Sequence, residues 1–430
     1  MSIFSSMYIG MSGMKVNEHA IGIVGDNIAN MNTIGFKASR GQFEDLLNQT
    51  ILGSAGASQV GQGATLAGVE RLHLQGALLG TGVSTDLAIG GNGFFIVNGS
   101  TAGTTGNFYT RNGQFHMDKD GYLVNAHGFK LQGYLANQDS QLSPILTDLQ
   151  VGNATLSPKS TEGIAMALNL DAETDIAANP FDPANPADSA GFSTAITVYD
   201  SLGKGHQLDV YFVKTAEGQW EWHALAEGGE LDGGVAGTPT EVASGTITFT
   251  TDGLLDTEAQ AASNVTFVGA SSQDLIFDFG EALTTDGGDG TGTSGFGSPS
   301  TVNFQKQDGY GAGSFQYMTI DAKGEIIGTF SNGEIRTLGQ VALATFPSQT
   351  GLKSIGQNLF LATRASGEPT VGGPGTGGRG DLYAGSLEQS NVDLTNEFTQ
   401  LIVSERGYQA NSRIISTADQ LLAEVIALKR

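Results

Sequence analysis

The carboxyl end of the chain carries apolar residues at intervals of seven, namely Leu394, Leu401, Tyr408, Ile415 and Leu422. This period places them on one stripe of a helix and is typical of a coiled-coil seam. Asp393 precedes the stripe as an N-cap, and the basic residues Lys429 and Arg430 follow it, as the helix dipole favours. We therefore predict a helix over 394–428, which at 1.5 Å per residue is about 50 Å long. Its apolar stripe needs a partner.

The amino end of the chain offers a second apolar stripe. Its members follow one another in steps of three, four or seven, as expected for one face of a helix. Two such helices could form a two-helix stalk on a monomer, but further apolar residues lie off both stripes: Ile3, Phe4, Ile9, Ile23, Ile414, Leu421 and Ile426. Additional apolar faces are typical of assembly surfaces. We predict a polymerisation interface built from Met7, Met11, Met14, Ile21, Val24, Ile28, Met31, Leu394, Phe398, Leu401, Tyr408, Ile415, Leu422 and Val425.

The composition of the 430-residue chain limits the classes of function. A formal net charge of −24 argues against a nucleic-acid partner, which would require a basic surface. No cysteine is present, so no disulfide and no thiolate metal site can form. No run of eighteen apolar residues occurs, and the first ten residues lack the basic and apolar segments of a cleaved signal peptide. We expect neither membrane insertion nor a cofactor.

The acidic residues are concentrated in the middle of the chain. Residues 171–305 contain 21 acidic residues and two lysines, whereas 71–170 and 306–379 together contain 11 acidic and 11 basic residues. A neutral region interrupted by an acidic one indicates a nested arrangement of domains. We predict three parts: 1–71 with 380–430 as paired terminal helices and an extended arm, 72–168 with 304–379 as a neutral β-rich domain, and 169–303 as an acidic inserted domain.

The region between the helices is expected to be β-rich. It contains most of the 63 glycines of the chain, and short alternating apolar segments such as 195–199 and 207–213 are separated by turn residues. An inserted barrel or sandwich is predicted. The fold class is thus mainly β with α-helical termini. None of the sequence motifs of hydrolases, zinc proteases or P-loop enzymes occurs, so an enzyme is not expected.

Several longer motifs at both ends of the chain carry a family resemblance. They are 27–37 (NIANMNTIGFK), 90–95 (GGNGFF), 387–394 (LEQSNVDL) and 406–411 (RGYQAN). In these motifs the chain resembles the bacterial flagellar rod and hook proteins, and the large acidic insert resembles the hook members. The signature residues are Asn27, Asn30, Asn32, Gly35, Phe36, Asn391, Asp393 and Arg406. Asp26 and Glu405 depart from the pattern, where Asn and Gln are usual.

The resemblance implies a structural subunit that polymerises into a short curved tube and acts as a universal joint between rod and filament. It also implies export through the type III flagellar secretion channel without a cleaved signal, an extracellular location in the flagellar hook, and contacts with further copies, the rod, the hook cap and the hook–filament junction proteins. Two alternatives remain: a distal rod or other axial protein, and a secreted monomeric adhesin or carbohydrate-binding β protein with a helical stalk.

Overall fold

The computed structural model describes residues 3–47, 49–53, 56–101, 103–137, 140–152, 154–261 and 263–427. The chain divides into two compact units. We call residues 1–153, 317–328 and 335–430 the terminal unit, and residues 154–316 and 329–334 the inserted unit. Both ends of the chain therefore belong to one unit. The finer division into three parts, with the helices separate from the neutral β domain, stays a prediction.

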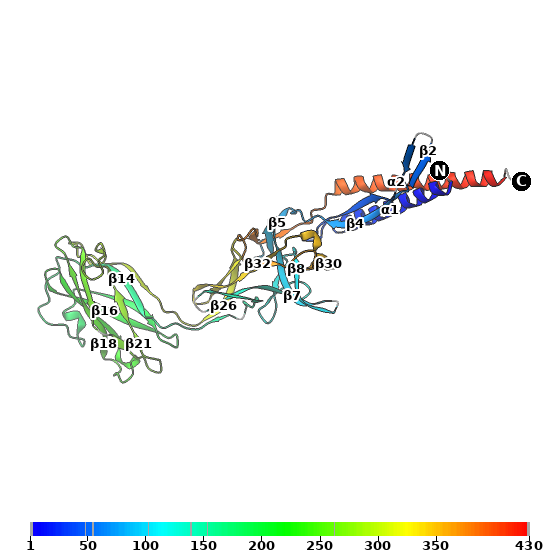
Figure 1. Ribbon diagram of the computed structural model, residues 1–430. Helices are drawn as coiled ribbons and strands as arrows, with labels where there is room; N and C mark the ends of the chain where they lie inside the picture. The colour runs from blue at the N-terminus through cyan, green and yellow to red at the C-terminus, as the bar shows by residue number, and fades with distance from the viewer. Residues whose placement is uncertain are drawn as a thin grey trace. The chain divides into compact units, whose positions relative to one another are not determined.

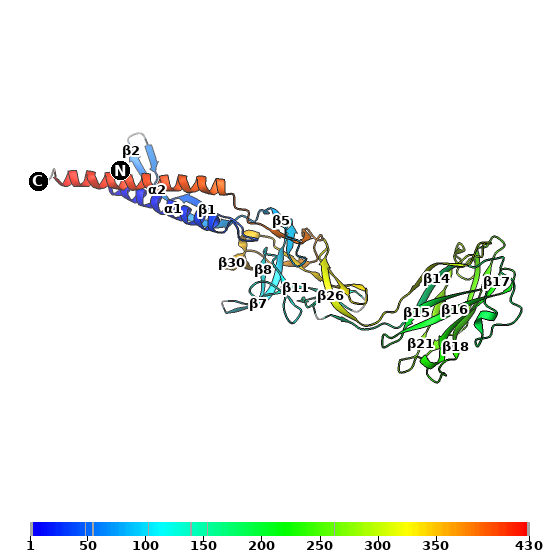
Figure 2. The same cartoon turned by 180° about the vertical axis from the view of Figure 1, so that it is seen from behind.

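Two long helices lie side by side in the terminal unit, as Figures 1 and 2 show from opposite sides. Helix α1 spans Ile3–Ala29 and α2 spans Leu394–Ala427. The predicted N-cap is confirmed, because Asp393 Oδ1 accepts hydrogen bonds from the backbone N–H groups of Thr395 (2.9 Å) and Asn396 (3.3 Å). The expected basic last turn lies outside the described residues. Met31 was wrongly assigned to the first helix: α1 ends at Ala29, and Met31 lies in the turn that follows.

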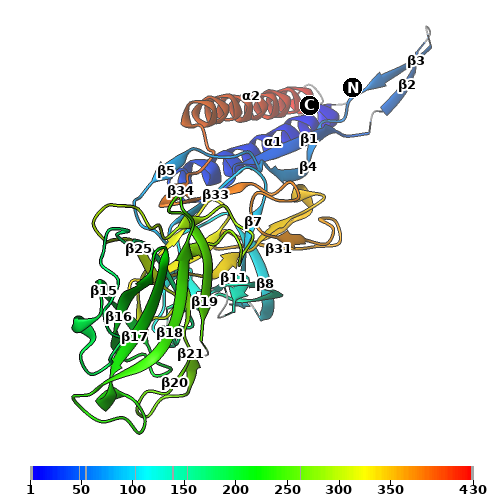
Figure 3. The same ribbon diagram turned by 90° about the vertical axis from the view of Figure 1, so that its left-hand side faces the viewer.

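A β-ribbon follows α1 where the sequence predicts an extended arm. Strand β1 pairs antiparallel with β4, and β2 pairs with β3. Figure 3 shows the β2–β3 hairpin projecting from the helix pair. The polar, glycine-rich composition of this segment concealed the strands, because it lacks the regular apolar alternation that marks a half-buried strand. The bounds are β1 Ser39–Asp45, β2 Gln49–Gly53, β3 Gly56–Val60 and β4 Ala64–Arg71.

The remainder of the terminal unit is a twisted β-structure. Its central strands follow the order β27-β28-β11-β7-β8-β31-β30. The core contains Phe94, Ile96, Tyr109, Phe346 and Phe360. The strands are β5 Leu78–Gly80, β6 Leu87–Gly90, β7 Phe94–Thr101, β8 Thr104–Thr110, β9 His116–Met117, β10 Leu123–Val124, β11 Lys130–Ala136, β12 Leu142–Asp148, β26 Gly313–Ile320, β27 Glu325–Phe330, β28 Ile335–Val341, β29 Leu343–Thr345, β30 Lys353–Gly356, β31 Leu359–Leu361, β32 Thr370–Gly372, β33 Asp381–Ala384 and β34 Ser386–Glu388.

The two larger sheets of the inserted unit share one core and do not form a closed barrel. Its five-stranded antiparallel sheet has the order β15-β16-β17-β18-β19, with several of these strands visible side by side in Figure 3, and the second sheet has the order β22-β14-β25. Trp220, Trp222, Phe212 and Met166 lie in the shared core. The strands are β13 Thr155–Leu156, β14 Gly163–Asn169, β15 Phe192–Tyr199, β16 Gly205–Ala216, β17 Gln219–Glu227, β18 Pro239–Phe249, β19 Leu255–Gln260, β20 Asn264–Val265, β21 Gln273–Asp274, β22 Ile276–Asp278, β23 Gly280–Glu281, β24 Thr291–Gly292 and β25 Thr301–Gln307.

The predicted fold class, mainly β with helical termini, is confirmed.

Candidate assembly interface

The two helices pack antiparallel through small and polar residues. A Cβ added to Gly13 would lie 2.6 Å from the Asn411 side chain, and one added to Gly407 would lie 2.6 Å from Asn17. Each asparagine is held by its own helix: Asn17 Nδ2 donates to the Gly13 carbonyl (2.7 Å), and Asn411 Nδ2 donates to the Gly407 carbonyl (2.9 Å). Two reciprocal Gly–Asn contacts therefore let the backbones approach closely.

The apolar heptad stripe lies only partly at this contact. Leu394, Leu401, Ile415 and Leu422 are half-buried, while Ser404 and Ala418 are the buried residues of α2. Phe398 (49% exposed), Tyr408 (40%) and Val425 (54%) lie on the outside. On α1, Val24 is buried, Met11 is exposed, and Met7, Met14, Ile21 and Ile28 are half-buried, as is Met31 after the helix. The helix pair thus covers only part of the predicted interface.

Asn27 ties the base of the helix pair together. Its side chain is buried, and its Nδ2 donates to Glu397 Oε1 on α2 (3.0 Å) and to the Ser39 carbonyl (2.8 Å). Its Oδ1 accepts from the Ser39 N–H (2.8 Å). Burial raises the pKa of Glu397, partly opposed by the Asn27 hydrogen bond. One amide therefore joins the end of α1, the start of β1 and the first turn of α2.

The other signature residues shape the turn after α1 and its contact with the segment before α2. Asn30 caps the end of α1 by donating to the Asp26 carbonyl (2.9 Å). Gly35 has φ +70°, and a Cβ there would lie 2.7 Å from the Arg111 backbone. Asn391 Oδ1 accepts from the Ala38 N–H (2.7 Å), and its Nδ2 donates to the Leu72 carbonyl (2.8 Å). Phe36 is buried, whereas Asn32 and Arg406 are exposed.

A buried ion cluster lies beside these residues. Glu388 has no exposed side-chain surface, and it accepts from Lys37 Nζ (2.6 Å), Arg111 Nη1 (3.3 Å) and the Gly76 N–H (2.8 Å). Lys37 Nζ also donates to the Leu74 carbonyl (2.7 Å). Burial lowers the pKa of both Lys37 and Arg111, and the Glu388 carboxylate opposes this. Two cations share one carboxylate in the interior.

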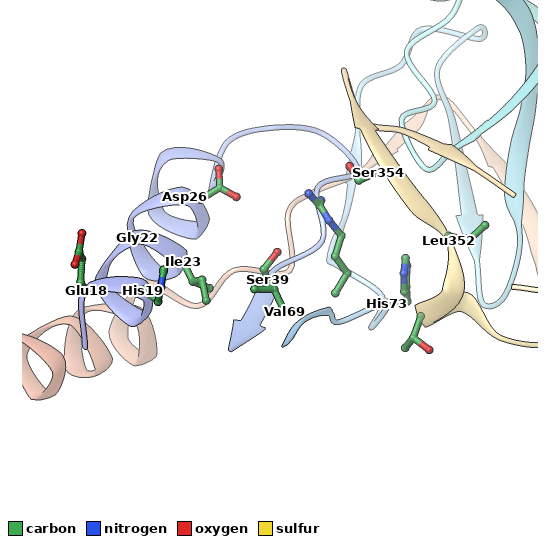
Figure 4. Close-up of a pocket in the computed structure, with 12 residues that line it drawn as sticks. Glu18, His19, Gly22, Ile23, Asp26, Ser39, Val69, His73, Leu352 and Ser354 are labelled. Carbon is green, nitrogen blue, oxygen red and sulfur yellow. The ribbon is translucent and has the colours of Figure 1, made fainter. Parts of the chain in front are cut away.

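A polar cleft of about 680 Å³ opens between α1 and the β30 region. Figure 4 shows Glu18, His19 and Asp26 on α1, with His73 and Leu352 across the cleft. His73 packs edge-on against Phe94 and Phe360, both at 5.6 Å between ring centroids. Burial, followed by the positive charges of Lys37, Arg111 and Arg71, lowers the pKa of His73 to about 4. The imidazole is neutral at pH 7.

Four family models match successive parts of the chain. These are the flagella basal body rod protein model over 7–37, the flagellar hook protein FlgE/F/G D1 domain over 88–164, the flagellar basal body protein FlaE D2 domain over 169–310, and the flagellar basal body rod FlgEFG protein C-terminal model over 383–428.

Full-length relatives agree with these matches. The flagellar hook protein FlgE of Borreliella burgdorferi is 35% identical, and that of Treponema pallidum is 33% identical, each over 99% of both chains. The chain belongs to the flagellar hook protein family. A solved structure of Helicobacter pylori flagellar hook protein FlgE2 aligns with 71% of this chain and all of its own, at 16% identity and a TM-score of 0.49. The chain is a structural subunit of a hook family that polymerises into the flagellar axial structure.

Membership of the hook family directs attention to packing surfaces. Among the described residues, no group of three or more His, Cys, Asp or Glu side chains is arranged to hold a metal. Neither described helix combines the length and the apolar character needed to span a bilayer.

Sequence reasoning on this hook-family chain missed the ion cluster as a unit. Lys37 and Glu388 stand inside two of the four motifs that carried the resemblance, but Arg111 stands outside all four. The available signal for this cluster was the presence of a charged residue inside an otherwise apolar or amide-rich motif. No local sequence pattern pairs residues that lie so far apart in the chain. It also missed the Gly–Asn contacts, because the heptad pattern drew attention to the large apolar residues.

Proposed function

We propose that this hook subunit polymerises through the outer faces of its terminal helices into a short curved tube that acts as a universal joint, passing motor torque from rod to filament. One observation carries the proposal: large apolar side chains remain exposed on both helices after they pair. They include Phe4 (62%), Tyr8 (64%), Phe398 and Ile402 (52%). Apolar surface of this extent favours burial against another copy.

The packing of the helices supports separate roles for two sets of side chains, one that joins α1 to α2 and one that contacts neighbouring subunits. Glycine and asparagine contacts hold α1 and α2 close together, which leaves their bulky apolar residues free for neighbours. The helices would form a stiff inner layer of the tube. The β domains, here taken as the neutral domain 72–168 with 304–379 and the acidic domain 169–303, would lie outward and exchange polar contacts as the tube bends.

The remaining expectations belong to the same proposal. The subunit would be exported through the type III flagellar channel without a cleaved signal and would assemble outside the cell. Its partners would be further copies, the rod, the hook cap and the hook–filament junction proteins. It would work by assembly rather than by catalysis.

Electron microscopy of the full-length protein tests this function. We expect wild-type protein to form tubes under polymerising conditions, and Ile402→Glu to stay monomeric because it places a charge on the apolar outer face of α2. Gln400→Glu is the matched control, since it adds the same charge at an exposed polar position of the same helix. Wild-type protein that stays monomeric at every concentration would contradict the proposal and favour the stalked monomeric adhesin.

A further inference from the structure

In the described part of the chain the guanidinium of Arg71 forms no ion pair, although the negative charge of Asp26 acts on it. Among the described residues, no side-chain hydrogen bond joins it to another group either, whereas Lys37 and Arg111 both pair with the buried Glu388 carboxylate. Burial lowers the pKa of Arg71, and the negative charge of Asp26 only partly opposes this. Partial burial without an ion pair is costly for a guanidinium, since it loses water without gaining a carboxylate.

Two aromatic rings hold Arg71 in place. Its Cζ lies 5.5 Å from the ring centroid of Phe36 and 5.8 Å from that of Phe360. These contacts fix the planar group and leave its N–H donors available, which is the arrangement that suits bidentate recognition of a carboxylate. The two rings therefore restrict the guanidinium before any ligand arrives.

Arg71 lines the polar cleft between α1 and the β30 region, where other hydrogen-bond donors accompany it. Ser39, Thr350 and Ser354 contribute hydroxyl groups to the same cleft. His73 also lines it. The acidic residues of the cleft, Glu18 and Asp26, come from α1 on the opposite wall and are exposed. The side of the cleft around Arg71 is therefore suited to an anion.

We propose that Arg71 binds an aspartate or glutamate side chain of a second copy of this chain, so that the cleft is an electrostatic contact between subunits. The inference rests on the proposed polymerisation. A second copy is the occupant that the charge balance favours, because each chain carries 44 acidic residues against 20 basic ones and so presents surplus carboxylates to its neighbours. Such a contact would fix the register between subunits, a role to which paired charges are suited.

Full-length Arg71→Gln protein tests the proposal by its critical concentration for polymerisation. We expect an increase of about tenfold, with Arg71→Lys in between because it keeps the charge but not the planar fork. Arg40→Gln is the control: Arg40 lies on the neighbouring strand in an exposed pair with Glu70, and its loss should change the value less than twofold. If Arg71→Gln protein polymerised at the same critical concentration as the wild-type protein, the proposal would be overturned.

Two further measurements do not depend on the stability of Arg71→Gln. In wild-type protein, arginine-specific labelling of Arg71 should fall several-fold from monomer to polymer; equal labelling in both would overturn the contact. In mixed polymers of isotope-labelled and unlabelled Arg71→Lys protein, a carbodiimide should join position 71 to an acidic side chain of the other copy. Links from position 71 to its own chain alone would count against it. Failure of wild-type protein to polymerise would instead refute the proposed function.

Discussion

Lys37 and Glu388 form a fully buried ion pair of 2.6 Å although 351 residues separate them in the sequence. The pair joins the segment that follows α1 to the segment that precedes α2, and Arg111 of the β-structure shares the same carboxylate. The point where the two ends of the chain enter the β-structure of the terminal unit is thus fixed by charge as well as by packing.

Removing the shared carboxylate should destabilise the terminal unit. Glu388→Gln leaves Lys37 and Arg111 buried without a counter-charge, so we expect a loss of about 3–5 kcal/mol. Circular dichroism at 222 nm follows this unit, because both long helices belong to it, whereas both tryptophans, Trp220 and Trp222, lie in the inserted unit. In denaturant, the helical signal should be lost earlier while the tryptophan fluorescence transition stays in place.

Glu70→Gln is the control for this experiment. Glu70 pairs with Arg40, whose side chain is 63% exposed, so solvent screens the interaction. We expect a change below about 1 kcal/mol. Equal effects of Glu70→Gln and Glu388→Gln would show that burial of the cluster contributes nothing.

Gly13→Ala should weaken the helix pair. The new Cβ would crowd the Asn411 amide and displace it from its hydrogen bond to the Gly407 carbonyl, at a cost of about 1–3 kcal/mol. Gly22→Ala in the same helix should instead stabilise by about 0.5–1 kcal/mol, because a Cβ there meets nothing within 4 Å and alanine favours helix. Unfolding followed by circular dichroism measures both changes in stability. The prediction requires a loss for Gly13→Ala and a gain for Gly22→Ala.

The neutral, half-buried His73 predicts a loss of stability in acid. Its pKa is about 4 in the folded chain against 6.5 for a free side chain, so the unfolded chain takes up a proton first as the pH falls. Stability of the terminal unit should therefore decrease between about pH 6.5 and 4, by up to roughly 3 kcal/mol. His73→Phe should flatten this dependence, whereas His127→Gln, at an exposed position, should not. An unchanged acid limb in His73→Phe would contradict the assignment.

His206 should stabilise the inserted unit by bridging two carboxylates. Its two ring nitrogens lie 3.1 Å from Asp200 and 2.8 Å from Glu230, and its ring stacks on Phe267. Burial alone would raise the pKa of Asp200, but the His206 hydrogen bond and backbone donors outweigh it and lower that pKa. His206→Gln should cost about 2–3 kcal/mol at pH 7. Tryptophan fluorescence in denaturant measures the effect.

The same bridge makes the stability of the inserted unit depend on pH. Here the group that titrates is the Asp200 carboxyl, whereas in the terminal unit it is the His73 imidazole. Because the folded pKa of Asp200 lies below the ordinary value of 3.8, its contribution is complete above about pH 4 and is lost as the pH falls through the lower, folded value. Asp252→Asn, at an exposed position of the same unit, should leave both stability and its pH dependence unchanged.

The sequence by itself determined the elements whose signals are local. The heptad spacing and Asp393 placed α2 at Leu394, and alternation placed β15 and β16, because side-chain period and capping depend on near neighbours. The Asn112-Gly113 step does not form a hairpin turn: β8 ends at Thr110 and pairs with β7 and β31, since an Asn-Gly step does not turn the chain unless the flanking segments also pair.

Only the tertiary structure decided what the helices present to each other. The heptad pattern indicated Tyr408 for the seam, yet Gly407 and Asn411 lie at the helix contact and Ser404 is buried, because close approach of two backbones selects small side chains over large apolar ones. In the same way, the meeting of Lys37, Arg111 and Glu388 depends on the path of the chain between them. Contacts between distant residues follow from the fold, and no local period records them.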